Sequence, residues 1–165
     1  MFYERLFDCL NRHGIRYLVV GGLAVNLHGV VRLTLDVDIA VDPAVDQSDA
    51  WDKACAELGL RPRQPVTWRQ MYSTEERHRL HQEKGLIAFC LLPSGPEDPV
   101  IDLLFEPGWI FAEAWARRKT VTTDGIDIPL ASIADLIAMK TEAGREKDLR
   151  DIKYLTIISR REDPA

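Results

Sequence analysis

The chain has 165 residues, of which 46% are hydrophobic and 28% charged, and this composition excludes a disordered segment and predicts one folded domain over residues 1–165. The formal net charge of −5 disfavours a protein that holds a long nucleic acid duplex through its phosphates, although a local basic patch is compatible with it. The three cysteines are widely spaced and form no C-x-x-C pair, which predicts reduced thiols and a cytoplasmic location. The sequence shows no signal-peptide pattern. It also has no long apolar run, so we expect no membrane span.

The first part of the chain predicts a helix, a strand, a glycine turn and a second helix. Apolar residues recur at helical spacing over residues 2–10. Residues 17–20 form a short apolar run rich in strand-forming residues, and the run ends abruptly at Gly21-Gly22. Residues 23–28 then have helical periodicity. A strand, a glycine turn and a helix in this order recur at phosphate-binding sites.

The clearest strand signal covers residues 35–42, where the side chains alternate between the two faces of a strand without a break. One face carries Leu35, Val37, Ile39 and Val41, and the other carries Asp36, Asp38, Ala40 and Asp42. We expect the first face to pack against the core.

The middle of the chain predicts a helix, an irregular connection and two strands. The helix is expected over residues 48–58, from the spacing of its apolar residues. Residues 61–84 contain six arginines and lysines and two prolines with little periodicity, which predicts a mobile or irregular connection, and Trp68 within it is a candidate for stacking on a nucleic acid base. The strands are expected at residues 86–92 and 100–105, as an antiparallel pair joined by a turn-rich segment.

The last third of the chain predicts a short helix, a hairpin and two longer helices. Their expected ranges are 110–117 for the helix, 119–128 for the hairpin around Asp124-Gly125, and 132–142 and 145–159 for the final helices. We therefore divide the domain into a core over about residues 15–130 and a C-terminal helical part over about residues 131–160.

Three aspartates are the candidate metal ligands. Asp36 and Asp38 lie two apart on a predicted strand, so both carboxylates project to one side and come within reach of one cation. A solvated strand face would explain this pair equally well. Asp102, between Ile101 and Leu103, supplies a third carboxylate if its strand is a neighbour. Three converging acids would repel one another unless a divalent cation neutralised them, which favours a metal site.

Gly21-Gly22 is the candidate phosphate-binding turn. Glycines let backbone N–H groups approach phosphate oxygens, and a following helix presents its positive N-terminal end. A tight turn between strand and helix is the alternative explanation. The order of features favours phosphate binding, because the glycines are followed by an acid-apolar-acid and later by an apolar-acid-apolar motif.

With these motifs the sequence resembles the DNA-polymerase-beta-like nucleotidyltransferase superfamily. The matching residues are Gly21-Gly22, Asp36-Val37-Asp38 and Ile101-Asp102-Leu103. The stretch Val-Gly-Gly-Leu-Ala, followed by Arg32-x-Thr34-x-Asp36-x-Asp38, is most similar to the small bacterial branch with antibiotic nucleotidyltransferases and toxin–antitoxin transferases of the abortive-infection type.

A late motif extends the resemblance, which covers about residues 15–154. Lys140 followed by Arg145-x-Lys147-Asp148-x-x-Asp151 resembles the basic and acidic helix that follows the catalytic domain in that branch. The chain differs at Leu23, where many relatives have a serine that contacts phosphate. It is also short, with little room for a separate acceptor-binding domain.

The resemblance implies an α+β fold, with a mixed β-sheet flanked by helices and followed by C-terminal helices. It implies an enzyme that transfers a nucleoside monophosphate from a nucleoside triphosphate such as ATP to an acceptor hydroxyl and releases pyrophosphate. Two Mg²⁺ ions would be held by Asp36, Asp38 and Asp102. The nucleotide would contact Gly21, Gly22, Arg32, Thr34, Lys140 and Lys147, although an exposed helix charge explains Lys147 equally well.

The acceptor is open at this stage, since RNA, a protein side chain and a small molecule are all compatible with the pattern. An antitoxin partner or a homo-oligomer would complete a site in so short a chain. The alternative function is a non-catalytic nucleotide- or partner-binding module, such as a toxin–antitoxin component that retains the fold.

Overall fold

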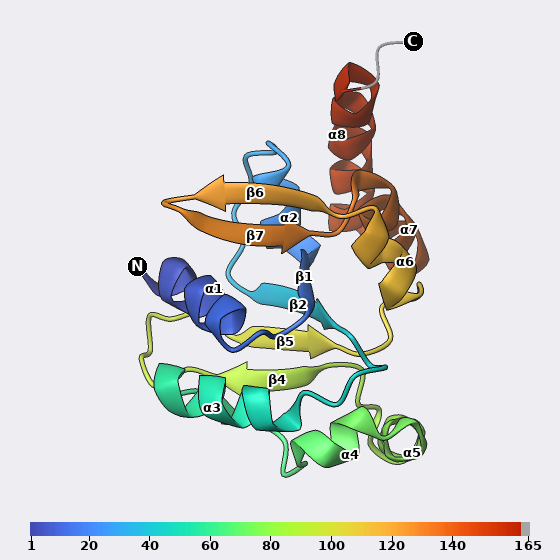
Figure 1. Cartoon of the computed structure of the whole chain (residues 1–165). Coiled ribbons are helices and arrows are strands. Elements are labelled where there is room, and N and C mark those ends of the chain that lie inside the picture. The colour runs from blue at the N-terminus through green and yellow to red at the C-terminus, as the bar shows by residue number, and fades with distance from the viewer. Residues whose placement is uncertain (163–165) are drawn as a thin grey trace.

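The computed structural model describes residues 1–162, which form a seven-stranded mixed sheet with helices packed around it (Figure 1). The strand order is β3-β4-β5-β2-β1-β7-β6. The strands are β1 (Tyr17–Val20), β2 (Val37–Val41), β3 (Arg61–Pro62), β4 (Phe89–Leu92), β5 (Ile101–Leu104), β6 (Lys119–Thr123) and β7 (Ile126–Leu130). The β2–β5 and β1–β7 pairs are parallel and the other neighbours are antiparallel. The fold class is therefore α+β, as predicted.

The helices are α1 (Phe2–Arg12), α2 (Gly21–Leu27), α3 (Ser48–Leu58), α4 (Trp68–Tyr72), α5 (Thr74–Lys84), α6 (Phe111–Ala116), α7 (Ile133–Ala143) and α8 (Glu146–Glu162). Helices α1 and α3 pack against each other, and α7 packs against α8, which projects from the body of the molecule (Figure 1). Within the described residues no helix combines the length and apolar character that a membrane crossing requires.

The strand predicted over residues 35–42 is shorter than expected. Strand β2 begins at Val37, and Leu35 is 72% exposed. Ala40 and Asp42, predicted on the polar face, are buried. The alternation fails because β2 lies in the middle of the sheet and is covered on both faces at its end, where Arg16 pairs with the Asp42 carboxylate at 3.0 Å.

The prediction of an irregular connection over residues 61–84 is wrong. This segment forms β3, α4 and α5. Both helices begin at a side-chain cap: the Thr67 side chain accepts a hydrogen bond from the backbone N–H of Gln70, and the Ser73 side chain accepts one from the backbone N–H of Glu76. A capping box and a serine cap are local signals that the high content of arginine and lysine masked.

Trp68 belongs to the core and is not placed to stack on a base. Its side chain is 6% exposed, stacks on Trp51 at 5.1 Å between ring centroids, and meets the edge of Phe89 at 4.8 Å. Aromatic residues in such contacts contribute packing energy beyond the area that they bury. The ring is therefore almost entirely buried.

Other predicted elements are confirmed. Helix α3 has the expected bounds, β4 and β5 are an antiparallel pair, and β6 and β7 form a hairpin. The hairpin turn places Asp124 and Gly125 at φ values of 51° and 76°, which is the left-handed backbone that an Asp-Gly turn adopts.

Candidate functional site

Two neighbouring strands bring Asp38 and Asp102 together. The parallel strands β2 and β5 pair in a register that makes these aspartates direct Cα partners. Ile39 and Leu103, next along each strand, are fully buried. Because successive strand residues point to opposite faces, burial of these apolar neighbours sends both carboxylates to the other face of the sheet. The strand adjacency required for a shared site is therefore present.

The surroundings of Asp38 disfavour its negative charge. Burial raises the pKa of this carboxyl group above its ordinary value, and the charge of Asp102 raises it further, with a smaller contribution from Asp36. A hydrogen bond from the Gly22 backbone N–H and the charge of Lys140 act in the opposite direction. Like charges held close in a partly buried place create a site that a cation would stabilise.

Asp102 carries an oxygen suited to a cation. Its Oδ1 is buried and has no hydrogen-bond partner among the described residues. Cys90 lies directly opposite on β4, and its thiol hydrogen-bonds to the same carboxylate. Burial, followed by this contact, raises the pKa of the Cys90 thiol. A buried carboxylate oxygen without a partner is costly, and a bound metal ion would satisfy it.

Asp36 stands apart from the other two aspartates. It precedes β2 and is exposed. The carboxylate oxygens of the three aspartates are not all within 4.8 Å of one another. Within residues 1–162, Cys9, His13 and Glu57 are the group that meets this distance. The charge of Asp36 nevertheless reaches the site, because it contributes to the raised pKa of Asp38.

The glycine pair allows the backbone to lie against the acidic site. Gly21 has a φ of +61°, and a Cβ there would be 1.9 Å from Asp38 Oδ2. A Cβ at Gly22 would be 2.5 Å from Thr34 Oγ1 and 3.5 Å from Arg32 Cζ. Sequence reasoning assigned these glycines to phosphate binding. In the structure Gly21 lies against the Asp38 carboxylate, which accepts a hydrogen bond from the Gly22 backbone N–H.

The predicted basic residues fall into two places. Lys140 on α7 is buried, and its Nζ lies 2.7 Å from Asp151 Oδ2 and 3.4 Å from Asp148 Oδ1 on α8. Arg32 pairs with the same Asp151, which links the loop before β2 to this network. Lys147 is exposed and lines a separate hollow of about 320 Å³ between residues 30–33 and α8.

A cleft of about 570 Å³ opens beside Asp38, within the size range of small-molecule sites. Gly21 and Asp38 form one side, and the other residues of interest that line it are Glu106, Lys140, Glu142 and Arg145. Hollows of similar volume occur elsewhere, so size alone does not select this one. Asp38 distinguishes this cleft from the others, although Asp36 and Asp102 do not line it. The sequence did not place Glu106 and Glu142 here, because Glu106 depends on the pairing of β5 with β2 and Glu142 on the packing of α7.

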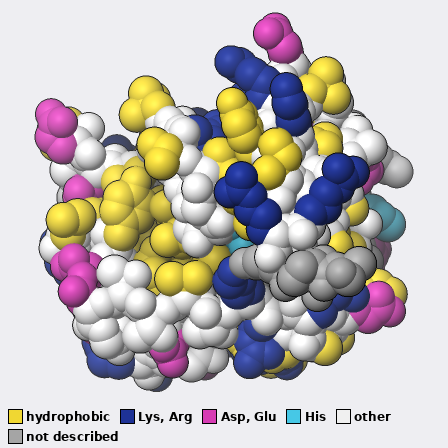
Figure 2. Space-filling view, turned by 90° about the horizontal axis from the view of Figure 1, so that it is seen from above, with side chains coloured by type: hydrophobic (Ala, Val, Ile, Leu, Met, Phe, Trp, Pro, Cys, Tyr) yellow, Lys and Arg dark blue, Asp and Glu magenta, His cyan; other side chains and the backbone are white. Residues whose placement is uncertain are grey.

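The face from which α8 projects is mixed in character. Figure 2 shows hydrophobic side chains beside lysines and arginines on this face. Large exposed hydrophobic residues of the described chain include Val31, Leu33 and Leu35 before β2 and Leu149 and Tyr154 on α8. None of these five residues lines the cleft that contains Asp38.

No protein-family model and no curated protein matches the sequence, but solved structures match the fold. A structure of ANT(2″)-Ia in complex with adenylyl-2″-tobramycin has 13% identity and a TM-score of 0.61, over 93% of this chain and 84% of that one. The lincosamide antibiotic adenylyltransferase LnuA, lincomycin-bound, has 18% identity and a TM-score of 0.62, over 95% and 96%. An antigenic nucleotidyltransferase-like protein from Paracoccidioides brasiliensis has 18% identity and a TM-score of 0.52, over 91% and 71%. The chain therefore has the fold of nucleotidyltransferases, as the motifs predicted.

Proposed function

We propose that this protein is a metal-dependent nucleotidyltransferase that transfers a nucleoside monophosphate from a nucleoside triphosphate to an acceptor hydroxyl and releases pyrophosphate. One observation carries the proposal: Asp38 and Asp102 face each other across neighbouring strands beside a glycine turn, and Asp102 Oδ1 is buried without a partner. A fold maintained only for binding has no evident need for this arrangement. The nucleotidyltransferase fold supports the same function.

Asp36, Asp38 and Asp102 would hold Mg²⁺, with two ions expected. The residues fit this role, because Mg²⁺ prefers oxygen ligands, and burial together with the charge of Asp102 raises the pKa of Asp38, a cost that a bound cation would offset. When bound, Mg²⁺ neutralises charge that develops on the phosphate oxygens and polarises the attacking hydroxyl.

The residues around the aspartates would position the triphosphate. The backbone at Gly21 and Gly22 holds Asp38 in place and keeps Thr34 within reach of the turn. Lys140 and Arg145 line the cleft and bring positive charge to its wall. Because phosphoryl transfer depends mainly on positioning and charge stabilisation, these contacts would provide most of what the protein contributes.

A small molecule is the acceptor class that we favour over RNA or protein, with an adenylyl group as the group transferred. One structural neighbour contains adenylyl-2″-tobramycin and another contains lincomycin. The chain covers 96% of lincomycin-bound LnuA, so a chain of about this length is compatible with a small-molecule acceptor. A cleft of about 570 Å³ suits a molecule of that size.

The test is transfer of label from α-labelled nucleoside triphosphates in the presence of Mg²⁺, with aminoglycosides, lincosamides and total RNA offered as separate acceptors. We expect transfer by the wild type and none by Asp38→Asn or Asp102→Asn, while Asp52→Asn, a change of an exposed carboxylate on α3, retains it. Transfer that survives loss of both aspartates would overturn the mechanism. Triphosphate binding that needs Mg²⁺ and the aspartates, without transfer to any acceptor, would instead support the non-catalytic module.

A further inference from the structure

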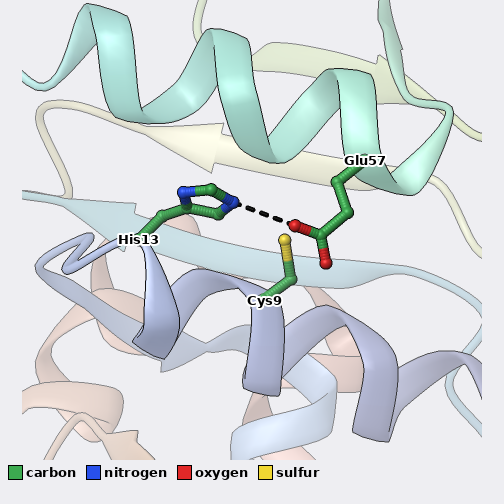
Figure 3. A group of neighbouring side chains, drawn as sticks. All are labelled: Cys9, His13 and Glu57. Carbon is green, nitrogen blue, oxygen red and sulfur yellow. Dashed lines mark hydrogen bonds and ion pairs between the residues drawn. The ribbon is translucent and has the colours of Figure 1, made fainter.

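A second group of potential metal ligands lies between α1 and α3, outside the cleft that contains Asp38. Cys9, His13 and Glu57 each offer one ligand atom, and these atoms all lie within 4.8 Å of one another. His13 Nε2 is 3.0 Å from Glu57 Oε2, and the Cys9 thiol points toward the same carboxylate (Figure 3). Sulfur, nitrogen and oxygen donors therefore converge on one point between two helices.

The positions of these residues explain the convergence. Cys9 and His13 are four residues apart at the end of α1, and this spacing places them on one face of a helix. Glu57 lies in the last turn of α3, which packs against α1. The packing of α1 against α3 therefore brings the three residues close together.

The second oxygen of Glu57 is held by an arginine. Arg12 pairs with Glu57 Oε1 and also with Asp8, at 2.8 Å. Hydrogen bonds from Arg12 and His13 lower the pKa of Glu57 to about 2, so the group is a carboxylate at neutral pH. Arg12 Nη1 also lies 3.4 Å from Oε2, so the arginine holds the whole carboxylate, which is the kind of outer contact that orients metal ligands in proteins.

We propose that Cys9, His13 and Glu57 form a binding site for a thiophilic divalent cation of the Zn²⁺ class, with a water molecule as the fourth ligand. The donor set favours this class, because Zn²⁺ accepts sulfur, nitrogen and carboxylate oxygen, whereas Mg²⁺ does not take thiolate ligands. Two ligands of one tetrahedral Zn²⁺ are separated by roughly 3.3–3.6 Å. The observed distance of 3.0 Å between His13 Nε2 and Glu57 Oε2 would have to increase only slightly to admit the ion.

Proton and charge balance are consistent with the site. Burial raises the pKa of Cys9 to about 11, so its thiol carries a proton that a bound cation displaces to solvent. One thiolate and one carboxylate then neutralise the two positive charges of the ion, while Arg12 stays neutralised by Asp8. His13 and Glu57 are 22% and 41% exposed, which gives the ion a path of entry and room for the water. Bound metal would tie α1 to α3.

The experiment is a titration of the purified protein with Co²⁺, followed by displacement with Zn²⁺. We expect one bound Co²⁺ with a sulfur-to-cobalt charge-transfer band in the near ultraviolet, loss of the band on addition of Zn²⁺, and no loss in excess Mg²⁺. His13→Gln and Glu57→Gln are expected to weaken Co²⁺ binding by at least about tenfold, and Cys9→Ser to abolish the band. His78→Gln, a change of an exposed histidine on α5, is the matched control and retains the wild-type affinity.

Two further variants separate this site from the aspartates. Cys90 contacts Asp102, so cobalt bound there could also gain a sulfur ligand. Cys90→Ser and Asp38→Asn are therefore expected to leave the charge-transfer band unchanged. The proposal is overturned by a wild type without the band, by a band that survives Cys9→Ser, or by His13→Gln protein with the wild-type affinity. If the Cys9→Ser protein does not fold, the Co²⁺ affinity of the His13→Gln protein still tests the proposal.

Discussion

Gly21 lies against the carboxylate of Asp38 so closely that a Cβ at this position would be 1.9 Å from Asp38 Oδ2. The Gly21→Ala change therefore combines a strained left-handed backbone with a direct clash, and we expect it to lower the free energy of unfolding by roughly 2–5 kcal/mol. Gly14→Ala is the control, because Gly14 has a φ of +65° and open space around it. That change is expected to cost about 1–2 kcal/mol from the backbone alone.

The same change should reduce transfer activity beyond its effect on stability. A displacement of a catalytic group by about 1 Å can cost about 100-fold in rate. We expect at least that loss for Gly21→Ala, measured at a temperature where the variant is folded, and wild-type turnover for Gly14→Ala. Equal activities in the two variants would contradict a role for Gly21 in seating Asp38.

The raised pKa of Asp38 predicts a pH dependence of stability. A carboxyl group whose pKa is higher in the folded chain contributes stability that is fully present below its ordinary value of 3.8 and is lost as the pH rises through the folded value. In EDTA, we expect Asp38→Asn to be more stable than the wild type at pH 7, with an advantage that shrinks toward pH 4. Urea unfolding over this range measures the difference, which isolates Asp38 from other titrating groups. Mg²⁺ should stabilise the wild type and not the variant.

A result in the opposite direction would be informative. If Asp38→Asn were less stable than the wild type at pH 7 in EDTA, the hydrogen bond from Gly22 and the charge of Lys140 would outweigh burial and repulsion from Asp102. The carboxylate would then be a structural anion and not an unsatisfied metal ligand. Asp52→Asn, on the exposed face of α3, controls for the general loss of one negative charge.

Lys140 and Lys147 are both predicted from the sequence to contact the nucleotide, but Lys140 is buried in the structure and Lys147 is exposed. Removal of a buried ion-pair partner costs about 3–5 kcal/mol, so Lys140→Met should lower the free energy of unfolding by about 3 kcal/mol. The lower end applies because Arg32 and Arg145 still neutralise the two aspartates of α8. Lys147→Met, at an exposed position, should change it by no more than about 0.5 kcal/mol.

Nucleotide affinity tests the same pair independently. The cleft that contains Asp38 is lined by Lys140 and not by Lys147. We expect Lys140→Met to weaken Mg²⁺–triphosphate binding and Lys147→Met to leave it unchanged, as measured by calorimetry. Equal weakening by both changes would mean that the hollow beside α8 is part of the nucleotide site.

The sequence predicted the strands and motifs of the site better than its surroundings. Local patterns predicted β1, the short helix after it and the direction of Asp38, because each depends on residues close together in the chain. The glycines predicted as a separate turn are the first residues of α2. The sequence did not predict that the strands of Asp38 and Asp102 are neighbours, because strand order depends on contacts between distant parts of the chain. The burial of Asp42 was missed for the same reason, because it depends on Arg16, far away in sequence.

The segment around Trp68 was predicted wrongly because its charges conceal an apolar anchor. Trp68 stacks on Trp51 and meets Phe89, so Trp68→Ala should lower the free energy of unfolding by about 3–5 kcal/mol. Trp68→Phe retains an aromatic ring and should recover a large part of this loss. Chemical unfolding monitored by circular dichroism measures both variants, and calorimetry measures nucleotide affinity under conditions where they are folded. A folded Trp68→Phe protein with a weakened affinity for nucleotide would show that the indole contacts the ligand, against its placement in the core.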